Sequence, residues 1–263
     1  MSNGPDDGLI WARPEPGTRK PRFSRQKIAE AALRIADEEG FEAVSMRRVA
    51  AELGAAPMTL YNYVRTKNDL LALMHDAILG EVLVPEEQLP GTWREAVTAI
   101  ACRVRAVLVR HPWAVSALQE AQPGPNAMRR FEQFLAATSD SGLSTGQKFD
   151  LLSVLNAYVF GNALITVESR KRADYPIDDP ALVEQVSAFA RAQMETGEFP
   201  HTAKLMAGFA DGTDDSTGPP MDEVGVDQQF QRGLAAMLDG LTEQFAADRA
   251  GRAKPAEGRP AAG

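Results

Sequence analysis

The sequence has little cysteine or histidine: one cysteine, Cys102, and three histidines in 263 residues. A single cysteine cannot form an internal disulfide, and so few soft ligands argue against a structural zinc site. No apolar run approaches the 18 residues of a membrane span, and no charged-then-apolar secretory leader is visible. We therefore expect a cytoplasmic protein with no metal, no cofactor and no membrane partner.

Segments that alternate between polar and apolar residues are also missing, so no β-strand is predicted. Apolar residues instead recur at helical spacing along a chain that is 44% hydrophobic. The predicted N-terminal helices are one capped by Ser24 and ended by Gly40, one capped by Ser45, one that begins at Pro57, and one that starts with a capping box at Thr66 and Asp69 and ends near Val82. Further helices are predicted over residues 92–110, 112–121, 126–138, 145–171, 180–196 and 226–247.

These helices indicate an all-α protein with a small N-terminal unit and a larger C-terminal one. Residues 1–22, rich in proline, glycine and charge, are expected to form a flexible basic arm. The three-helix unit is expected over residues 23–70 and the larger helical domain over residues 71–248. Residues 211–225 are expected to be a flexible loop within that domain, and residues 249–263 a disordered tail.

The charge is unevenly distributed along the chain. A net charge of −8 argues, taken alone, against a nucleic-acid partner, because phosphate attraction requires clustered lysine and arginine. Between Arg13 and Lys67, however, eleven basic residues face seven acidic ones, a local charge of +4. The N-terminal unit is therefore the part suited to nucleic acid.

The segment "GAAPMTLYNYVRTKNDLL", residues 54–71, has the pattern of a second helix that crosses the first after a tight turn. With Leu60 and Val64 buried, the residues left outside are Pro57, Met58, Thr59, Tyr61, Asn62 and Tyr63. Arg47 and Arg48 precede this surface and Lys67 follows it, which is typical of a helix that enters the major groove between phosphate contacts. The alternative is that the tyrosines pack sideways in a small core.

Residues 24–71, "SRQKIAEAALRIADEEGFEAVSMRRVAAELGAAPMTLYNYVRTKNDLL", resemble the DNA-binding domain of the tetracycline repressor family. The segments "YVFGNALITVESR" and "FQRGLAAMLDGLTEQF" are similar to the helices with which that family dimerises. The resemblance implies a helix-turn-helix domain followed by a helical ligand-binding and dimerisation domain. It implies a ligand-responsive transcriptional regulator, foremost a repressor that binds a palindromic operator as a homodimer and is released by a small molecule.

The resemblance also implies roles for individual residues. Arg47 matches a position that contacts a guanine edge, and Pro57 and Met58 match base-contacting positions, where apolar side chains reach only thymine methyl groups. Tyr61 and Lys67 match positions that bind the DNA backbone, and Thr59 is a candidate phosphate donor. The full DNA-binding prediction is Arg47, Arg48, Pro57, Met58, Thr59, Tyr61, Asn62, Tyr63 and Lys67.

The larger acidic domain is by elimination the sensor. His111 matches the position at which tetracycline-binding relatives hold a magnesium–drug complex; the alternative is a capping or packing histidine before Pro112. The predicted ligand-binding residues are His111, Trp113, Gln119, Asn156, Phe160, Asn162 and Met74. An apolar pocket with few polar groups indicates an apolar or aromatic effector rather than tetracycline.

Two other hypotheses belong to different classes. The first is a helical ligand-binding or interaction protein without DNA affinity, which the acidic net charge favours. The second is a hydrolase, because "GLSTG" (residues 142–146) matches a nucleophile elbow around Ser144. That chemistry requires a strand before the serine, and none is predicted, so Ser144 or Thr145 is expected to cap a helix and no enzyme is expected.

Overall fold

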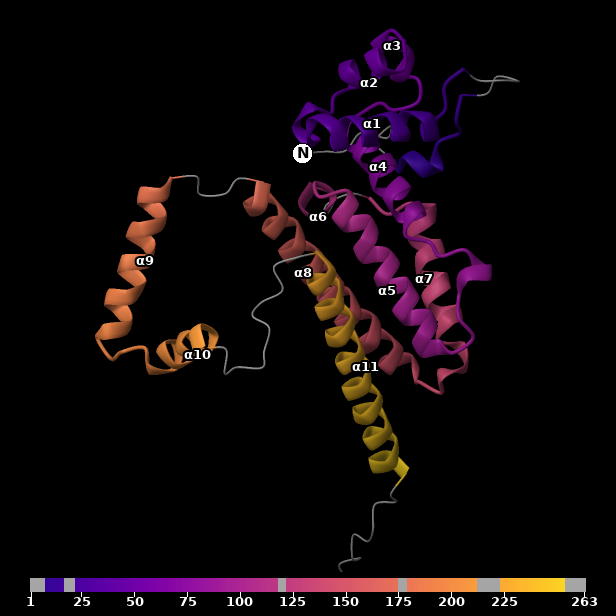
Figure 1. Ribbon diagram of the computed structural model, residues 1–263. Helices are drawn as coiled ribbons and strands as arrows, with labels where there is room; N and C mark the ends of the chain where they lie inside the picture. The colour runs from indigo at the N-terminus through magenta and orange to yellow at the C-terminus, as the bar shows by residue number, and fades with distance from the viewer. Residues whose placement is uncertain (1–7, 17–21, 118–121, 175–178, 212–222, 254–263) are drawn as a thin grey trace, which may run out of the picture. The chain divides into compact units, whose positions relative to one another are not determined.

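The computed structural model of the chain describes residues 8–16, 22–117, 122–174, 179–211 and 223–253 (Figure 1). These described residues form helices, turns and loops and no strand, which confirms the predicted all-α class. The chain separates into two compact units, Met1–Leu164 with Leu238–Gly263, and Ile165–Met237. Each unit is described by itself.

The four N-terminal helices begin and end where the sequence places them. They are α1 (Arg25–Glu39), α2 (Met46–Glu52), α3 (Pro57–Leu60) and α4 (Lys67–Glu81), with a 3₁₀ turn η2 (Phe41–Ala43) between the first two. The Ser24 and Ser45 side chains accept hydrogen bonds from the third residue beyond each, and Thr66 and Asp69 form the expected capping box. Gly40, at φ 89°, ends α1 in a conformation that favours glycine.

The core of the N-terminal helices is built from one stripe of each. Ile28 and Ile35 of α1, Val49 of α2, Leu60 of α3 and Leu70 of α4 are all at most 1% exposed. Because α3 has only four residues, its position depends on Leu60 and on the buried Val64 just after it. The burial that the sequence predicts for Leu60 and Val64 is confirmed.

Part of the expected flexible arm is folded against the N-terminal helices. Residues Ile10–Ala12 form the 3₁₀ turn η1, and Ile10 is fully buried. The Arg13 side chain forms an ion pair with Asp69, and its carbonyl oxygen accepts a hydrogen bond from Arg25. The prediction of a flexible arm is therefore wrong for residues 8–16, because an isolated apolar pair, Ile10 and Trp11, supplies an anchor; Arg19 and Lys20 lie outside the described residues.

The rest of the first unit contains α5 (Trp93–Arg110), α6 (Ala114–Ala117), α7 (Pro125–Ala137) and the adjoining parts of α8 (Thr145–Asp174) and α11 (Glu223–Ala253), with the 3₁₀ turns η3 (Glu86–Gln88) and η4 (Ser139–Ser141). Ser144 accepts a hydrogen bond from the Gln147 N–H, so it caps α8 as predicted. Helix α11 continues into the expected disordered tail as far as Ala253.

Helix α8 buries Leu151, Leu155 and Val159, whereas Phe149 is exposed. By length and composition, the segment Thr145–Lys171 could cross a membrane, but a helix of a soluble core meets the same criterion. It is the one such helix among the residues described.

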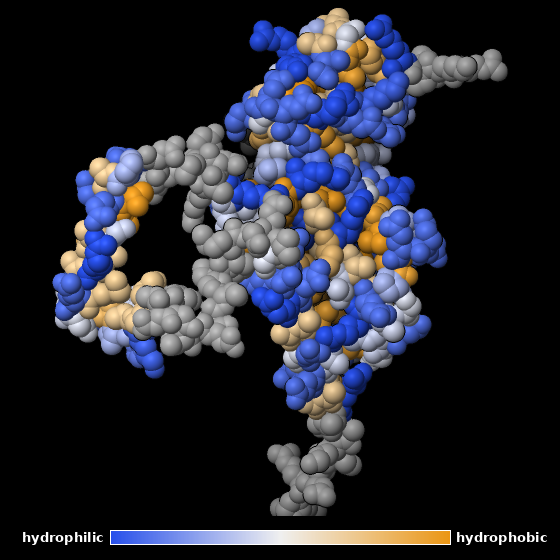
Figure 2. Space-filling model, in the orientation of Figure 1, coloured by the Kyte–Doolittle hydropathy of each residue, from blue (hydrophilic) through white to orange (hydrophobic). Residues whose placement is uncertain are grey.

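The second unit contains α9 (Pro180–Glu195) and α10 (Pro200–Asp211), which contact each other, together with the adjoining parts of α8 and α11. Helix α10 was missed by the sequence analysis, and it ends where a loop was expected; residues 212–222 lie outside the described part. Apolar side chains are exposed along both helices, as the orange and tan colours of Figure 2 show. They are Leu182, Val183, Val186, Phe189, Leu205 and Met206.

Candidate functional site

A tight turn sets the angle between α2 and α3. Gly54 has φ 60°, and the Ala55 N–H donates to the Ala50 carbonyl at 2.8 Å, so the chain reverses directly after α2. Pro57 then starts α3, where its missing N–H removes no helical hydrogen bond. The arrangement presents the outer face of α3 to solvent while Leu60 holds its inner face.

The nine residues predicted to bind DNA all lie on α2, on α3 and the turn after it, or at the start of α4. Six are exposed and three are half-buried, namely Arg48, Thr59 and Tyr63. Met58 is 74% exposed although its side chain is apolar. The structure therefore leaves this surface accessible, and the individual DNA contacts remain predictions.

Arg48 already has carboxylate partners within the domain. Its guanidinium lies 2.5 Å from Glu39 at the end of α1 and 3.1 Å from Glu52 at the end of α2. These hydrogen bonds raise the pKa of Arg48 and lower that of Glu39. A phosphate would compete with two carboxylates for Arg48, whereas Arg47 is exposed.

The end of α5 joins α1 through a polar network. Nδ1 of His111 lies 2.7 Å from Oδ1 of Asp37 on α1, and the Trp113 Nε1 donates to the same oxygen at 2.7 Å. The Trp113 ring stacks on Phe41, with ring centroids 5.7 Å apart. We call Asp37, Phe41, His111 and Trp113 the α1–α5 joint; it ties the C-terminal helices of the first unit to α1.

Both ring nitrogens of His111 contact carboxylates, since Nε2 also lies 3.2 Å from Oε2 of Glu81. The side chain is 5% exposed. Within the described part of the chain, no group of three His, Cys, Asp or Glu residues could hold a metal ion. The structure thus places His111 and Trp113 in the joint, and their assignment to ligand binding remains untested.

A cavity of about 290 Å³ lies among α4, α5, α6, α7 and α8. We call it the His75–Arg130 cavity, because these two side chains are its polar residues. The remaining lining is Ile78, Leu79, Val82, Val104, Leu108, Ala114, Val115 and Phe160. A second space of about 40 Å³ shares Arg130 and Val104 with it and includes Asn156. An apolar cavity with few polar groups is typical of a small-molecule site.

The predicted ligand residues are divided among several places. Phe160 lines the cavity, and Asn156 accepts a hydrogen bond from Arg130 at 2.6 Å. Asn162 accepts one from Arg105, and Met74 is fully buried. Gln119 lies outside the described residues.

The sequence analysis missed His75 and Arg130. His75 lies mid-way along α4, a helix assigned there largely to the N-terminal unit. Arg130 looked like an ordinary surface cation in the run "MRRF". Its position between Met128 and Phe131 on an amphipathic helix was the available signal, but it does not tell which of Arg129 and Arg130 points inward.

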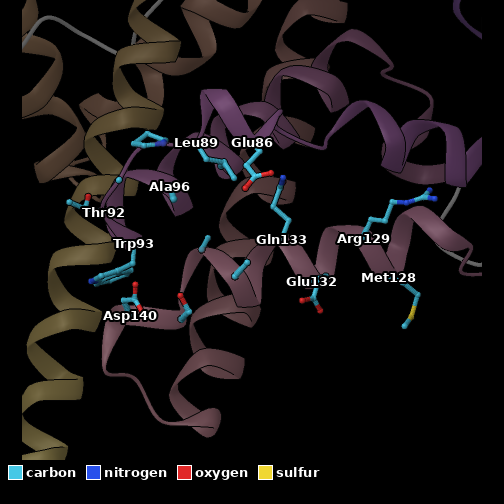
Figure 3. A pocket seen from close by; sticks show the side chains of 15 residues that line it. Glu86, Leu89, Thr92, Trp93, Ala96, Met128, Arg129, Glu132, Gln133 and Asp140 are labelled. Carbon is cyan, nitrogen blue, oxygen red and sulfur yellow. The ribbon is translucent and has the colours of Figure 1, made fainter.

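A more open hollow of about 960 Å³ lies along α7, from Met128 to Ala137 (Figure 3). Its side chains come from α7, the start of α5, the loop before α5 and η4, with Trp93 and Asp140 at one end of the view and Met128 and Arg129 at the other. None of the predicted ligand residues lines it.

Comparison with known proteins decides the family. Residues 28–74 match the family model described as "Bacterial regulatory proteins, tetR family", and residues 84–245 match "Tetracyclin repressor-like, C-terminal domain". The chain belongs to the TetR family. It is therefore a ligand-responsive, DNA-binding transcription regulator with a helix-turn-helix domain and a helical C-terminal domain.

Several TetR-family proteins resemble this chain over most of its length. The HTH-type transcriptional repressor DrrR1 of Streptomyces coeruleorubidus is 34% identical over 255 residues, covering 94% of this chain and 88% of DrrR1. An HTH-type transcriptional regulator of Saccharopolyspora erythraea is 39% identical over 158 residues, covering 59% of this chain and 66% of that protein. ActR of Streptomyces coelicolor, in complex with actinorhodin, has a TM-score of 0.60 and 28% identity, covering 85% of this chain and 97% of ActR.

Proposed function

We propose that this TetR-family regulator is a cytoplasmic repressor that binds a palindromic operator as a homodimer and releases it when an apolar or aromatic effector binds. The name of DrrR1, a transcriptional repressor similar over 94% of this chain, supports repression. The structure of ActR with a bound ligand supports an effector site in the helical domain. Because we propose a repressor, we expect the effector to release the protein from DNA rather than to promote DNA binding.

The observation that carries the proposal is that one helix, α4, belongs to both candidate surfaces. Its first residue, Lys67, is on the DNA-binding surface, and His75, Ile78 and Val82 line the cavity. Eight residues of helix separate Lys67 from His75, about 12 Å along the axis. An effector that shifts α4 within its packing would therefore move the DNA-binding helices, and a coupling of about 1.4 to 3 kcal/mol would change operator affinity tenfold to about a hundredfold.

The homodimer is supported by an unpartnered face of α8 within the first unit. Val154 and Leu164 are exposed on it, together with the small residues Ala157 and Gly161. Small residues allow helices to approach closely, and larger apolar neighbours then bury area across the contact. Two copies joined this way would present two α3 helices to two half-sites.

The DNA-binding proposal is tested by selecting bound duplexes from a random pool and titrating the enriched sequence across salt concentrations. We expect an inverted repeat whose affinity falls steeply with salt. In a dimer, Tyr61→Ala combined with Lys67→Ala removes two positive charges, so the slope of log affinity against log salt should become shallower by about 2.

The matched control is Lys204→Ala, which removes an exposed lysine on α10. It should leave both the affinity and the salt slope unchanged. Failure to enrich any inverted repeat with folded dimer, or equal binding by the double variant and wild type, would refute the assignment of this surface. If only the DNA-binding surface is refuted, the proposal that the cavity binds a ligand is unaffected.

A further inference from the structure

The His75–Arg130 cavity contains a half-buried cation, Arg130, without a counter-charge. Arg130 lies on α7 and donates from Nη2 to the Asn156 amide oxygen at 2.6 Å. Its Nε is buried and has no hydrogen-bond partner. Within the described residues, no carboxylate forms an ion pair with it, and burial lowers its pKa. A guanidinium that is partly removed from water and lacks an anion is destabilised, so the cavity has an electrostatic preference for an anion.

His75 contributes a second unsatisfied atom to the same cavity. Nδ1 is buried without a partner, while the ring makes a hydrogen bond to the backbone at Gln122. That bond favours the protonated nitrogen at Nε2, because it raises the pKa of the ring. Burial is the largest effect and lowers the pKa of His75 below its ordinary value, against the opposing effects of this bond and of the Asp76 charge; the Arg130 charge lowers it by a smaller amount. A neutral ring with its proton on Nε2 leaves Nδ1 as an acceptor for a ligand O–H.

The other walls define the rest of the ligand. Ile78, Val104, Leu108 and Phe160 are apolar, and a volume of about 290 Å³ suits a molecule of two or three rings. Nothing among these walls could hold a second charged group. The polar atoms of Arg130 and His75 therefore lie in a cavity whose other walls favour an apolar ligand surface.

From these contacts we infer that the effector class is a hydroxylated aromatic acid, whose carboxylate or acidic oxygen binds Arg130 and whose hydroxyl donates to Nδ1 of His75. This inference rests on the proposed function, because it names the ligand of the site through which the repressor is released. It excludes cationic effectors, which Arg130 would repel in a medium of low polarity.

The test uses calorimetric titration of the full-length protein, without DNA, with two probes that share one ring system: 4-hydroxy-1-naphthoate and 1-naphthol. We expect the acid to bind about 10- to 100-fold more tightly, since a hydrogen bond to a charged group is stronger than one between neutral groups. Equal affinities for the two probes, or no binding of either at about 1 mM, would overturn the inference. This comparison requires no variant.

Substitutions then locate the charge. Arg130→Gln should remove the preference for the acid while changing the affinity for 1-naphthol less than threefold, roughly the experimental scatter of such titrations. Arg129→Gln is the matched control: Arg129 is exposed, bonds to Asn126 and lines the other hollow, so its loss should not change binding. Retention of the acid preference in Arg130→Gln would overturn the assignment.

The inference and the proposed function fail in different measurements. If the acid binds with the expected preference but the protein binds no operator, or binds one that the acid does not release, the effector class stands and the repressor hypothesis fails. If the operator is bound and the acid shows no preference, the repressor hypothesis stands and the effector class is wrong.

Discussion

Replacement of Arg13 by alanine tests whether the folded N-terminal segment contributes to stability. The Arg13 guanidinium pairs with Asp69 at the start of α4, where the carboxylate is 9% exposed. The same carboxylate accepts hydrogen bonds from the backbone N–H groups of Arg65, at 2.9 Å, and Thr66, at 3.2 Å. Arg13→Ala therefore leaves a largely buried carboxylate that has lost its cation but keeps two neutral donors.

The two remaining backbone donors set the size of the expected loss of stability. Removal of one partner from a buried ion pair costs about 3 to 5 kcal/mol, and a charged hydrogen bond contributes about 1.5 to 3 kcal/mol. Because two backbone donors remain, we expect the lower range, about 2 kcal/mol. For a chain of this length that lowers Tm by about 4 to 8 °C.

The cost should also depend on pH. Burial opposes ionisation of Asp69, but hydrogen bonds from Arg13 and from the backbone of Arg65 outweigh it and lower its pKa. A lowered folded-state pKa gives stability that is complete above the ordinary value, about 3.9, and is lost as pH falls through the folded-state value. The difference between wild type and Arg13→Ala should therefore be full at pH 7 and shrink below about pH 4.

Thermal unfolding followed by circular dichroism, at equal protomer concentration, measures both effects, because dimer stability depends on concentration. The control is Arg22→Ala, which removes an exposed arginine that makes one hydrogen bond of 3.3 Å, to the Gly54 carbonyl. Equal Tm values for the two variants at pH 7, or a difference that does not change on acidification, would contradict the role assigned to Arg13.

Two further predictions concern packing. Gly124→Ala would place a Cβ 2.4 Å from a carboxylate oxygen of Asp76, so we expect chemical denaturation to show a loss of about 1 to 3 kcal/mol in the free energy of unfolding. Gly91→Ala is the control: Gly91 has open space around it, so its substitution should leave stability unchanged. Equal denaturation midpoints for the two variants would contradict the tight packing of Gly124 against Asp76. Leu60→Ala should lower the free energy of unfolding by about 2 to 5 kcal/mol and abolish operator binding, because α3 loses its buried anchor. Met58→Ala, at an exposed position of the same helix, should leave stability unchanged. A stable Leu60→Ala protein with intact operator binding would show that other contacts hold α3.

Most helix boundaries could be predicted because local chemistry determines them. Ser24, Ser45 and Thr66 cap helices through hydrogen bonds to residues three positions away, and Pro57 starts α3. These signals depend on a few neighbouring residues and are independent of tertiary structure. Helix α10 was missed because its apolar residues are exposed and follow no buried stripe.

The DNA-binding surface was easier to predict than the cavity. Leu60 and Val64 fix which face of α3 points inward, so its outer face follows from helical geometry. The cavity gathers residues from five helices, and His75 and Arg130 are 55 positions apart in the chain. No local pattern brings them together, and the ordered segment with Arg13 was missed for the same reason: its partner Asp69 lies 56 residues away.

The four-residue length of α3 has a consequence for how operator preference can change during evolution. The helix is held by Leu60 and the adjacent Val64, and its exposed positions make few contacts with the rest of the protein. Surface substitutions away from buried contacts usually alter stability by less than about 0.5 kcal/mol. A lineage can therefore exchange the exposed residues of α3 that are predicted to face DNA, and acquire new target genes, without first accumulating compensating changes in the core.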